Sequence, residues 1–148
     1  MELATTRTGM VSLTARFDPV NMDGATVSRA YLHNLDNFRS LQLGSGDTIR
    51  VYRANMIIPQ IACNLTKSGT YRLPMSCPCC GAALEVGETT GGTHQLFCRN
   101  RSCTARLVQK FVHFCDKSRM NIEGLSETTL EKLIGHGWIH TFADLYDL

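Results

Sequence analysis

Aromatic residues are scarce in this 148-residue sequence, which contains 7% of them and a single tryptophan. One large core of aromatic side chains is therefore not expected, and several small cores fit the length better. No stretch approaches the roughly 20 apolar residues of a membrane-spanning helix. The first residues also lack a basic segment followed by an apolar one, which argues against a signal peptide. We expect a cytoplasmic protein with no membrane partner.

Charge of either sign is also limited, since charged residues make up 19% of the chain and the formal net charge is +2. The charges are unevenly placed. Residues 1–72 hold eight Lys and Arg against five acids, and residues 73–119 hold six against three. Residues 120–148 instead hold five acids and one cation, Lys132. A basic body is typical of proteins that face polyanions, although a merely solvated basic surface is also common.

Cysteines, by contrast, are abundant: there are seven, an odd number. Four of them form two close pairs, Cys77 with Cys80 and Cys98 with Cys103, which favours a metal site over a disulfide framework. A Cys-x2-Cys turn followed by Gly81 lets two thiolates converge on a metal while backbone amides point at the sulfurs. Four thiolates make a closed tetrahedral site, for which structural zinc is favoured.

Alternatives to this zinc site remain open. The cysteines could be isolated buried thiols, or they could hold an iron–sulfur cluster, whose common motifs have a different spacing. Cys79 could compete with Cys80, although the turn geometry favours Cys77 with Cys80. We interpret His94, in a loop rich in Gly and Thr, as solvent-exposed rather than as a ligand.

Turn residues divide residues 1–72 into short strands around one helix. The helix is expected within residues 33–43, with Asn34 as its cap. Breaks are expected at Asp18-Pro19 and Asp23-Gly24. Strands are expected over residues 8–17, 25–32, 48–53 and 56–65. Many strands around one short helix predict a mostly β, Greek-key barrel of the OB type.

The pattern changes after residue 72. Residues 73–104 hold the cysteine pairs and too few apolar residues for a core, so we assign them to a small four-cysteine zinc finger. Residues 105–148 are expected to be a short helical hairpin segment, which makes the overall class α+β. An amphipathic helix is expected over 104–119 and another over 126–134, opened by Ser126.

Four single residues complete this pattern. Thr141, with Asp144 three residues later, resembles the capping box of a final helix. Cys63 and Cys115 fall within a strand pattern and a helix pattern, so we expect both in the core.

Three groups of motifs follow one another along the chain. The first comprises Arg7-Thr8-Gly9, Pro19-Val20, Asp23 to Ala30, Leu32 to Asn34, Gly46-Asp47, Val51 to Ala54 and Ile57 to Gln60. The second is the two cysteine pairs. The third is Asn121 to Leu125 with Ala143 to Tyr146. Together these motifs resemble the C-terminal part of bacterial NAD-dependent DNA ligases, with its OB domain, four-cysteine zinc finger and the start of its helix-hairpin-helix domain.

The resemblance implies an enzyme that seals nicks in duplex DNA in replication and repair, using NAD and Mg²⁺. It implies that the OB domain contacts nicked double-stranded DNA through Arg7, Thr8, Arg53, Ile57 and Ile58. Arginines can hold phosphates or enter a narrow groove, and isoleucines can rest on sugars. Alternatively, Arg53 is an ordinary exposed strand residue, and strand alternation turns either Ile57 or Ile58 into the core.

Departures from the family limit what is implied. Asn55-Met56 stands where the family has Gly-Asp, although Asn tolerates the left-handed turn. Ser126 replaces a glycine of the hairpin region, and Glu2 to Thr6 does not continue the family's preceding strand, which favours an artificial start. No Lys-x-Asp-Gly motif is present. The resemblance thus implies no catalytic residue here, with an adenylation domain as the missing intramolecular partner of a monomeric enzyme.

Two other function classes compete with this interpretation. A single-strand-binding OB module with a zinc ribbon would stack bases on aromatic side chains. Tyr31, Phe38, Tyr52 and Tyr71 are available, but no two form an obvious strand pair. A protein–protein scaffold, in which the zinc finger only packs the barrel against the helices, would bind no DNA.

Overall fold

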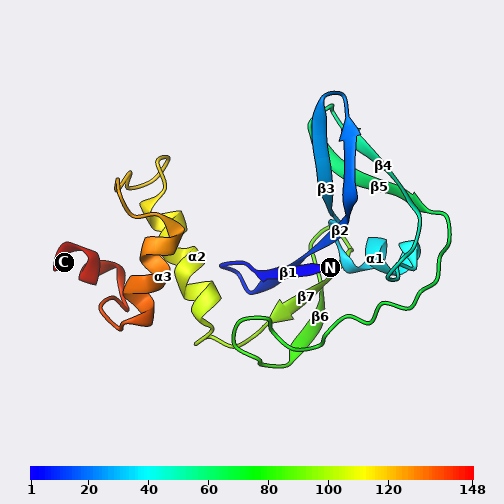
Figure 1. The fold of residues 1–148 in the computed structure, drawn as a ribbon. Coiled ribbons are helices and arrows are strands. Elements are labelled where there is room, and N and C mark those ends of the chain that lie inside the picture. The colour runs from blue at the N-terminus through cyan, green and yellow to red at the C-terminus, as the bar shows by residue number, and fades with distance from the viewer.

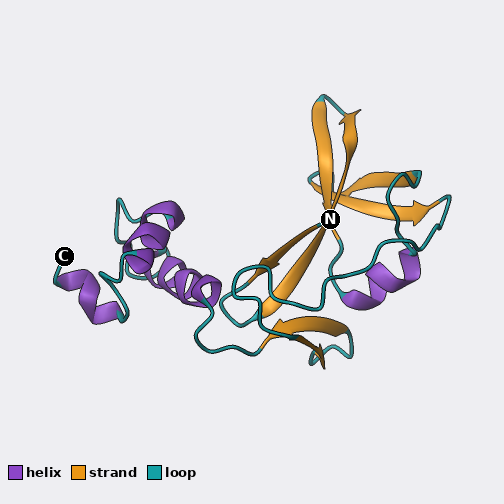
Figure 2. Cartoon of the chain, turned by 60° about the horizontal axis from the view of Figure 1, so that its bottom comes forward, coloured by secondary structure: helices purple, strands orange, loops and turns teal.

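The computed structural model describes residues 1–148 as a β-rich body followed by a group of helices (Figure 1). Figure 2 shows the strands gathered with α1, and the other helices lying to one side of them. The elements are β1 (Glu2–Thr5), β2 (Met10–Met22), β3 (Ala25–Tyr31), α1 (Leu35–Leu41), β4 (Ile49–Ala54), β5 (Ile58–Asn64), β6 (Leu84–Glu88), β7 (His94–Cys98), α2 (Thr104–Cys115), α3 (Glu127–Gly135) and the 3-10 helix η1 (Phe142–Tyr146). None of these helices has the length and apolar character needed to cross a bilayer.

The long strand β2 organises the sheet. It pairs antiparallel with β1, β3 and β7, and β6 extends the sheet beyond β7. β4 and β5 form a separate antiparallel pair. A mostly β architecture with one strand shared among several partners is consistent with the expected OB fold. β1 covers most of Glu2 to Thr6, a segment for which no strand was expected.

β2 runs through Asp18-Pro19, so the predicted break there is wrong. Its pairing with β3 continues on both sides, but the register shifts between Arg16 and Val20. Proline has no N–H to donate to a ladder, and a bulge accommodates it while bending the strand. The break at Asp23-Gly24 is confirmed, with φ of 51° and 80° in the turn of the β2–β3 hairpin.

Helix α1 is confirmed within the expected segment. The side chain of Asn34 accepts a hydrogen bond from the Asn37 N–H at 2.7 Å, which caps the helix as predicted. Leu35 and Leu41 are buried, whereas Gln42 ends the helix in the left-handed region at φ 47°. The amphipathic pattern therefore fixes one face of α1 against the strands.

One hydrophobic cluster of 14 buried residues includes side chains from both sides of residue 72. Val11 and Leu32 belong to it, together with Leu84 and Leu96 from the β6–β7 hairpin. β7 pairs with the start of β2, with Val11 opposite Leu96. The sequence did not predict this hairpin, because its Gly- and Thr-rich turn resembles a loop. Residues 73–104 thus lack a core of their own and share the main one.

A second cluster of six buried residues holds α2 and α3 together: Val108, Phe111, Cys115, Leu130, Ile134 and Ile139. The predicted core position of Cys115 is confirmed, whereas Cys63 is only half-buried and belongs to neither cluster. α2 ends at Cys115, four residues before the predicted end at 119. Directly after this end, the side chain of Asp116 accepts a hydrogen bond from the Ser118 N–H.

The caps of the last two helices are confirmed. Ser126 accepts a hydrogen bond from the Thr129 N–H at the start of α3. Thr141 and Asp144 form the expected capping box. The helix that follows, η1, has 3-10 geometry and five residues.

Candidate metal centre and nucleic-acid interface

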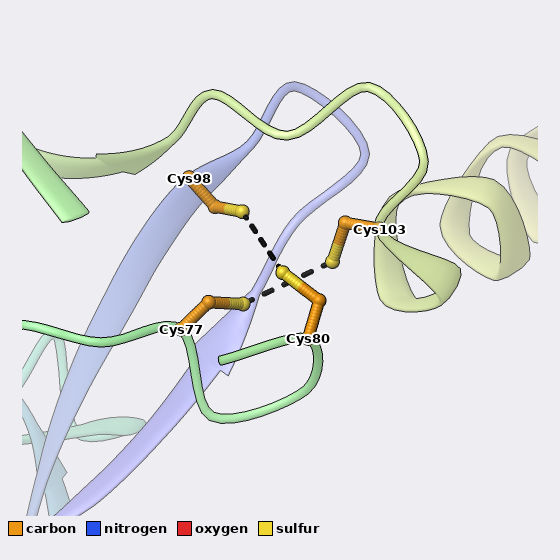
Figure 3. A group of neighbouring side chains, drawn as sticks. All are labelled: Cys77, Cys80, Cys98 and Cys103. Carbon is orange, nitrogen blue, oxygen red and sulfur yellow. Dashed lines mark hydrogen bonds between the residues drawn. The ribbon is translucent and has the colours of Figure 1, made fainter. Parts of the chain in front are cut away.

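The structure brings the sulfurs of Cys77, Cys80, Cys98 and Cys103 within 4.8 Å of one another (Figure 3). Two of the Sγ–Sγ distances are 3.8 Å, between Cys77 and Cys103, and 3.6 Å, between Cys80 and Cys98. A zinc ion bonded to four thiolates at about 2.3 Å holds its sulfurs about 3.8 Å apart. The group is therefore of the size and chemistry that could hold such an ion.

Local structure places each of the four sulfurs. Cys77 and Cys80 lie in a turn closed by hydrogen bonds from the Cys77 N–H to the Ala82 carbonyl and from the Gly81 N–H to the Cys77 carbonyl. Gly81 sits at φ 72°, in the left-handed region that glycine adopts without strain. Cys98 ends β7 and Cys103 precedes the first residue of α2.

The thiols differ in how readily they lose a proton. Burial acts to raise the pKa of Cys77, but the backbone N–H groups of Cys80 and Cys79 and the Thr5 hydroxyl lower it to about 6. The Ala82 N–H and the Asn100 side chain lower the pKa of Cys80.

The other two thiols behave in the opposite way. Burial raises the pKa of Cys98, and it raises the pKa of Cys103 to about 12. The turn thus favours thiolates at Cys77 and Cys80, whereas a bound cation would favour ionisation of Cys98 and Cys103.

Residues far along the chain hold this group against the β-rich body. The Thr5 hydroxyl lies 3.3 Å from the Cys77 sulfur. Arg106 donates from Nη1 to the carbonyls of Cys98 and Asn100, both at 3.3 Å. No sequence pattern indicates either role, because Thr5 is 72 positions from Cys77 and Arg106 resembles any exposed helix residue.

Gly9 allows the β1–β2 turn to approach the cysteine group closely. The Cys98 N–H donates to the Gly9 carbonyl at 2.7 Å. Gly9 has φ 88°, and a Cβ at this position would collide with the Cys98 carbonyl oxygen. A glycine is therefore required both by the backbone conformation and by the space.

Cys79 and His94 lie outside the group of four. Cys79 is exposed. His94 is half-exposed and contacts Asp36 of α1, with its Nδ1 3.0 Å from the Asp36 Oδ1. The backbone N–H of His94 also donates a hydrogen bond to the Asp36 Oδ2 at 2.7 Å. That backbone bond is the main cause of the lowered pKa of Asp36. This contact joins residues 58 positions apart, so sequence spacing could not reveal it.

The residues expected at DNA fall into two places. Arg7 and Thr8 are exposed in the turn between β1 and β2. Arg53, Ile57 and Ile58 lie together at the end of the β4–β5 hairpin. In Figure 1 the β1–β2 turn extends towards α2, whereas the β2–β3 and β4–β5 hairpins rise from the other side of the body.

The expectation that Ile57 or Ile58 turns into the core is wrong. Their exposed fractions are 71% and 48%. Asn55 and Met56 have φ of 52° and 58°, and the Ile57 N–H donates to the Ala54 carbonyl, which makes a two-residue turn. The departure at Asn55-Met56 therefore preserves the hairpin, and the turn carries Ile57 outside the alternation of the strand.

Arg53 is half-buried rather than an ordinary exposed strand residue. Its Nη1 is 3.5 Å from the Met22 carbonyl at the tip of the β2–β3 hairpin. Its Nε is buried without a hydrogen-bond partner. A guanidinium carries five N–H donors, so most of them remain available to a ligand.

Comparison with known proteins agrees with the motifs. Residues 1–71 match the family model of the NAD-dependent DNA ligase OB-fold domain. The chain is 47% identical over 148 residues to a DNA ligase of Ruminiclostridium cellulolyticum, covering 100% of the chain and 22% of that protein. It is 47% identical over 146 residues to a DNA ligase of Lachnoclostridium phytofermentans, covering 99% of the chain and 22% of that protein.

A more distant relative gives the same result. A DNA ligase of Haloquadratum walsbyi is 39% identical over 148 residues, covering 96% of the chain and 19% of that protein. The chain thus spans about a fifth of the length of these relatives. Residues 1–71 thus match the OB-fold domain of NAD-dependent DNA ligases, and the likeness to DNA ligases extends along the whole chain.

Proposed function

We propose that this chain is the DNA-binding portion of an NAD-dependent DNA ligase, which seals nicks in duplex DNA in replication and repair. The match of residues 1–71 to the ligase OB-fold domain carries this proposal. The chain would bind nicked duplex and position it for the adenylation domain of the same protein. NAD and Mg²⁺ would act at that domain, because none of the four lysines here stands in a Lys-x-Asp-Gly motif. The ligase is proposed to be a cytoplasmic monomer.

The exposed end of the β4–β5 hairpin supports the DNA-binding part of the proposal. The side chains of Ile57 and Ile58 are exposed to solvent although both are entirely apolar. Covering one isoleucine is worth up to about 1.5–3 kcal/mol, and deoxyribose offers an apolar surface for it. Arg53, beside them, has N–H donors free for phosphate or for a narrow minor groove.

We further propose that Cys77, Cys80, Cys98 and Cys103 hold a structural zinc ion. Their sulfur separations and the two thiols with lowered pKa values support this assignment. Four protein ligands leave no position for a substrate. Bound zinc would supply folding energy, and the chain's own residues would then hold the β6–β7 hairpin against the start of α2.

Fluorescence anisotropy of the zinc-loaded chain with nicked duplex, intact duplex and single-stranded DNA, at two salt concentrations, tests the proposal. Duplex binding that weakens steeply with salt, with poorer binding of single strands, is the expected result. Preference for single strands would instead support the base-stacking module. No binding to any of the three would support the scaffold and overturn the proposal.

A further inference from the structure

The side chain of Arg106 reaches back from α2 to the loop of residues 98–103, which carries two of the four clustered cysteines. Its Nη1 donates to the carbonyls of Cys98 and Asn100, both at 3.3 Å. The Asn100 carbonyl also accepts the Cys103 N–H at 3.2 Å. Figure 3 shows Cys103 where this loop enters the helix. One guanidinium nitrogen therefore holds the loop at Cys98 and at the residue whose carbonyl positions Cys103.

The backbone of Arg106 acts on the same group of cysteines. Its N–H is hydrogen-bonded to the Cys103 sulfur. Arg106 lies in the first turn of α2, where the N–H groups have no partner within the helix and carry partial positive charge. The side chain and the main chain of this residue thus both present positive charge to the cysteine group.

The guanidinium of Arg106 also lies against the β1–β2 turn. A Cβ on Gly9 would be 3.3 Å from both the Nε and the Cζ of Arg106. The Nε is buried and has no hydrogen-bond partner. The absence of a side chain at position 9 therefore leaves room for the guanidinium beside the turn, where solvent does not reach its Nε.

Arg106 has no carboxylate with which to pair. Its side chain is half-buried, and none of the salt bridges in the chain includes it. The two arginines of the neighbouring loop differ, since Arg99 pairs with Glu85 and Arg101 is exposed to solvent. A charged group that is withdrawn from water requires a counter-charge to offset the lost hydration.

The cysteine group can supply this counter-charge when it holds a metal. Four thiolates carry four negative charges and a zinc ion carries two positive ones, so the loaded group has an excess of negative charge. The groups that contact metal ligands commonly tune how tightly the metal is held. Arg106 contacts Cys98 through its side chain and Cys103 through its backbone, and it is well placed for such a role.

We propose that Arg106 is a positioning residue of the metal centre, whose guanidinium offsets the negative charge of the thiolates and holds the loop of residues 98–103 around the metal. The inference rests on the metal centre proposed above. It predicts that loss of the charge at position 106 weakens metal binding, although none of the four cysteines is changed.

The test compares Arg106→Gln, Arg106→Lys and Arg101→Gln with the original chain. Glutamine keeps N–H donors without a charge, whereas lysine keeps the charge without the planar fork of donors. Arg101→Gln is the matched control, because it removes the same charge from the same loop at an exposed side chain.

The first readout is zinc affinity, measured by competition with a chromogenic chelator. Arg106→Gln should weaken zinc binding about 10- to 100-fold, as the loss of a group that contacts metal ligands commonly does. Arg106→Lys should recover most of this loss, because it restores the charge. Arg101→Gln should leave the affinity unchanged.

The second readout is the absorption spectrum of the chain loaded with cobalt(II), which a mere loss of stability would not move. A positive charge beside the sulfurs stabilises their lone pairs and so raises the energy of the sulfur-to-cobalt charge-transfer band. Arg106→Gln should therefore shift this band to longer wavelength. The shift should be smaller in Arg106→Lys and absent in Arg101→Gln.

The outcomes separate this inference from the proposed metal centre. An Arg106→Gln chain with the original zinc affinity and band position would overturn the inference and leave the metal centre standing. Equal losses of affinity in Arg106→Gln and Arg106→Lys, with the band unmoved, would mean that the residue only supports the fold, and would overturn it too. If Arg106→Gln binds no metal, Arg106→Lys decides: near-original affinity supports the inference and lost binding overturns it. If the original chain binds neither zinc nor cobalt, the metal centre fails as well.

Discussion

Leu96 ties the cysteine-bearing hairpin to the β-rich body, and its replacement by alanine tests whether the two form one cooperative unit. Its side chain is 1% exposed, and it belongs to the same cluster as Val11, its partner across the β2–β7 pairing. Removing the carbons of its side chain beyond Cβ forfeits about 0.8 kcal/mol for each, and the cavity left behind adds to this loss. Leu96→Ala should therefore lower the free energy of unfolding by about 2–5 kcal/mol.

The assay is chemical denaturation of the zinc-loaded chain followed by two probes, circular dichroism for the strands and a chromogenic chelator for the zinc that is released. Val86→Ala provides the control, because Val86 pairs with Leu96 from β6 but is 44% exposed. Val86→Ala should lower the free energy of unfolding by less than about 1 kcal/mol, since the Val86 side chain buries less apolar area than that of Leu96.

Two results would refute this reasoning. One is a loss below about 1 kcal/mol in Leu96→Ala, because a buried leucine in a packed cluster costs more than that. The other is zinc release well before the strands unfold, which would mean that the hairpin melts alone and does not share the core.

Single contacts lead to three further predictions. Gly9→Ala should lower the free energy of unfolding by at least about 1 kcal/mol, measured by denaturation, because the added Cβ would collide with the Cys98 carbonyl oxygen. Gly24→Ala should lower it by less, because Gly24 also has a positive φ, 80°, but no atom lies near its Cβ position. Hydrogen bonds from Asn64 and Ser68 lower the pKa of Asp47 in the folded chain. The ionised carboxylate therefore stabilises the fold at pH values above the pKa of Asp47 in the unfolded chain. This stabilisation is lost as the pH falls through the pKa of Asp47 in the folded chain. Asp47→Asn should therefore flatten the acid side of the stability–pH curve, and an unchanged curve would contradict this. Arg53→Ala should weaken duplex binding by about 1–3 kcal/mol in the anisotropy assay, and unchanged affinity would remove Arg53 from the interface.

Local signals in the sequence predicted those features that depend on neighbouring residues. Asn34 caps α1 and Ser126 caps α3, because a side-chain oxygen only has to reach an N–H three residues away. The spacing of the cysteine pairs likewise predicted which four sulfurs converge and which cysteine, Cys79, stays outside. Each helix cap and each close cysteine pair is encoded within a few residues of chain.

Features that depend on distant pairing escaped prediction. Asp18-Pro19 has the composition of a turn, but β3 pairs on both sides of it and keeps β2 extended. The β6–β7 hairpin has a Gly- and Thr-rich turn that resembles a loop, and the hairpin is stabilised by joining the sheet beside Met10 and Val11. The contact between Asp36 and His94 has no local signature at all. In each case the deciding partner lies elsewhere in the chain.

The two hydrophobic clusters divide this chain into two packed units. The 14-residue cluster makes one unit of the barrel strands and the β6–β7 hairpin, and the six-residue cluster makes another of α2 and α3. Cys103 and Arg106 lie at the junction, the first within the sulfur group and the second bonded to the Cys98 and Asn100 carbonyls. A metal held by the four sulfurs would therefore fix the position of α2 relative to the β-rich body.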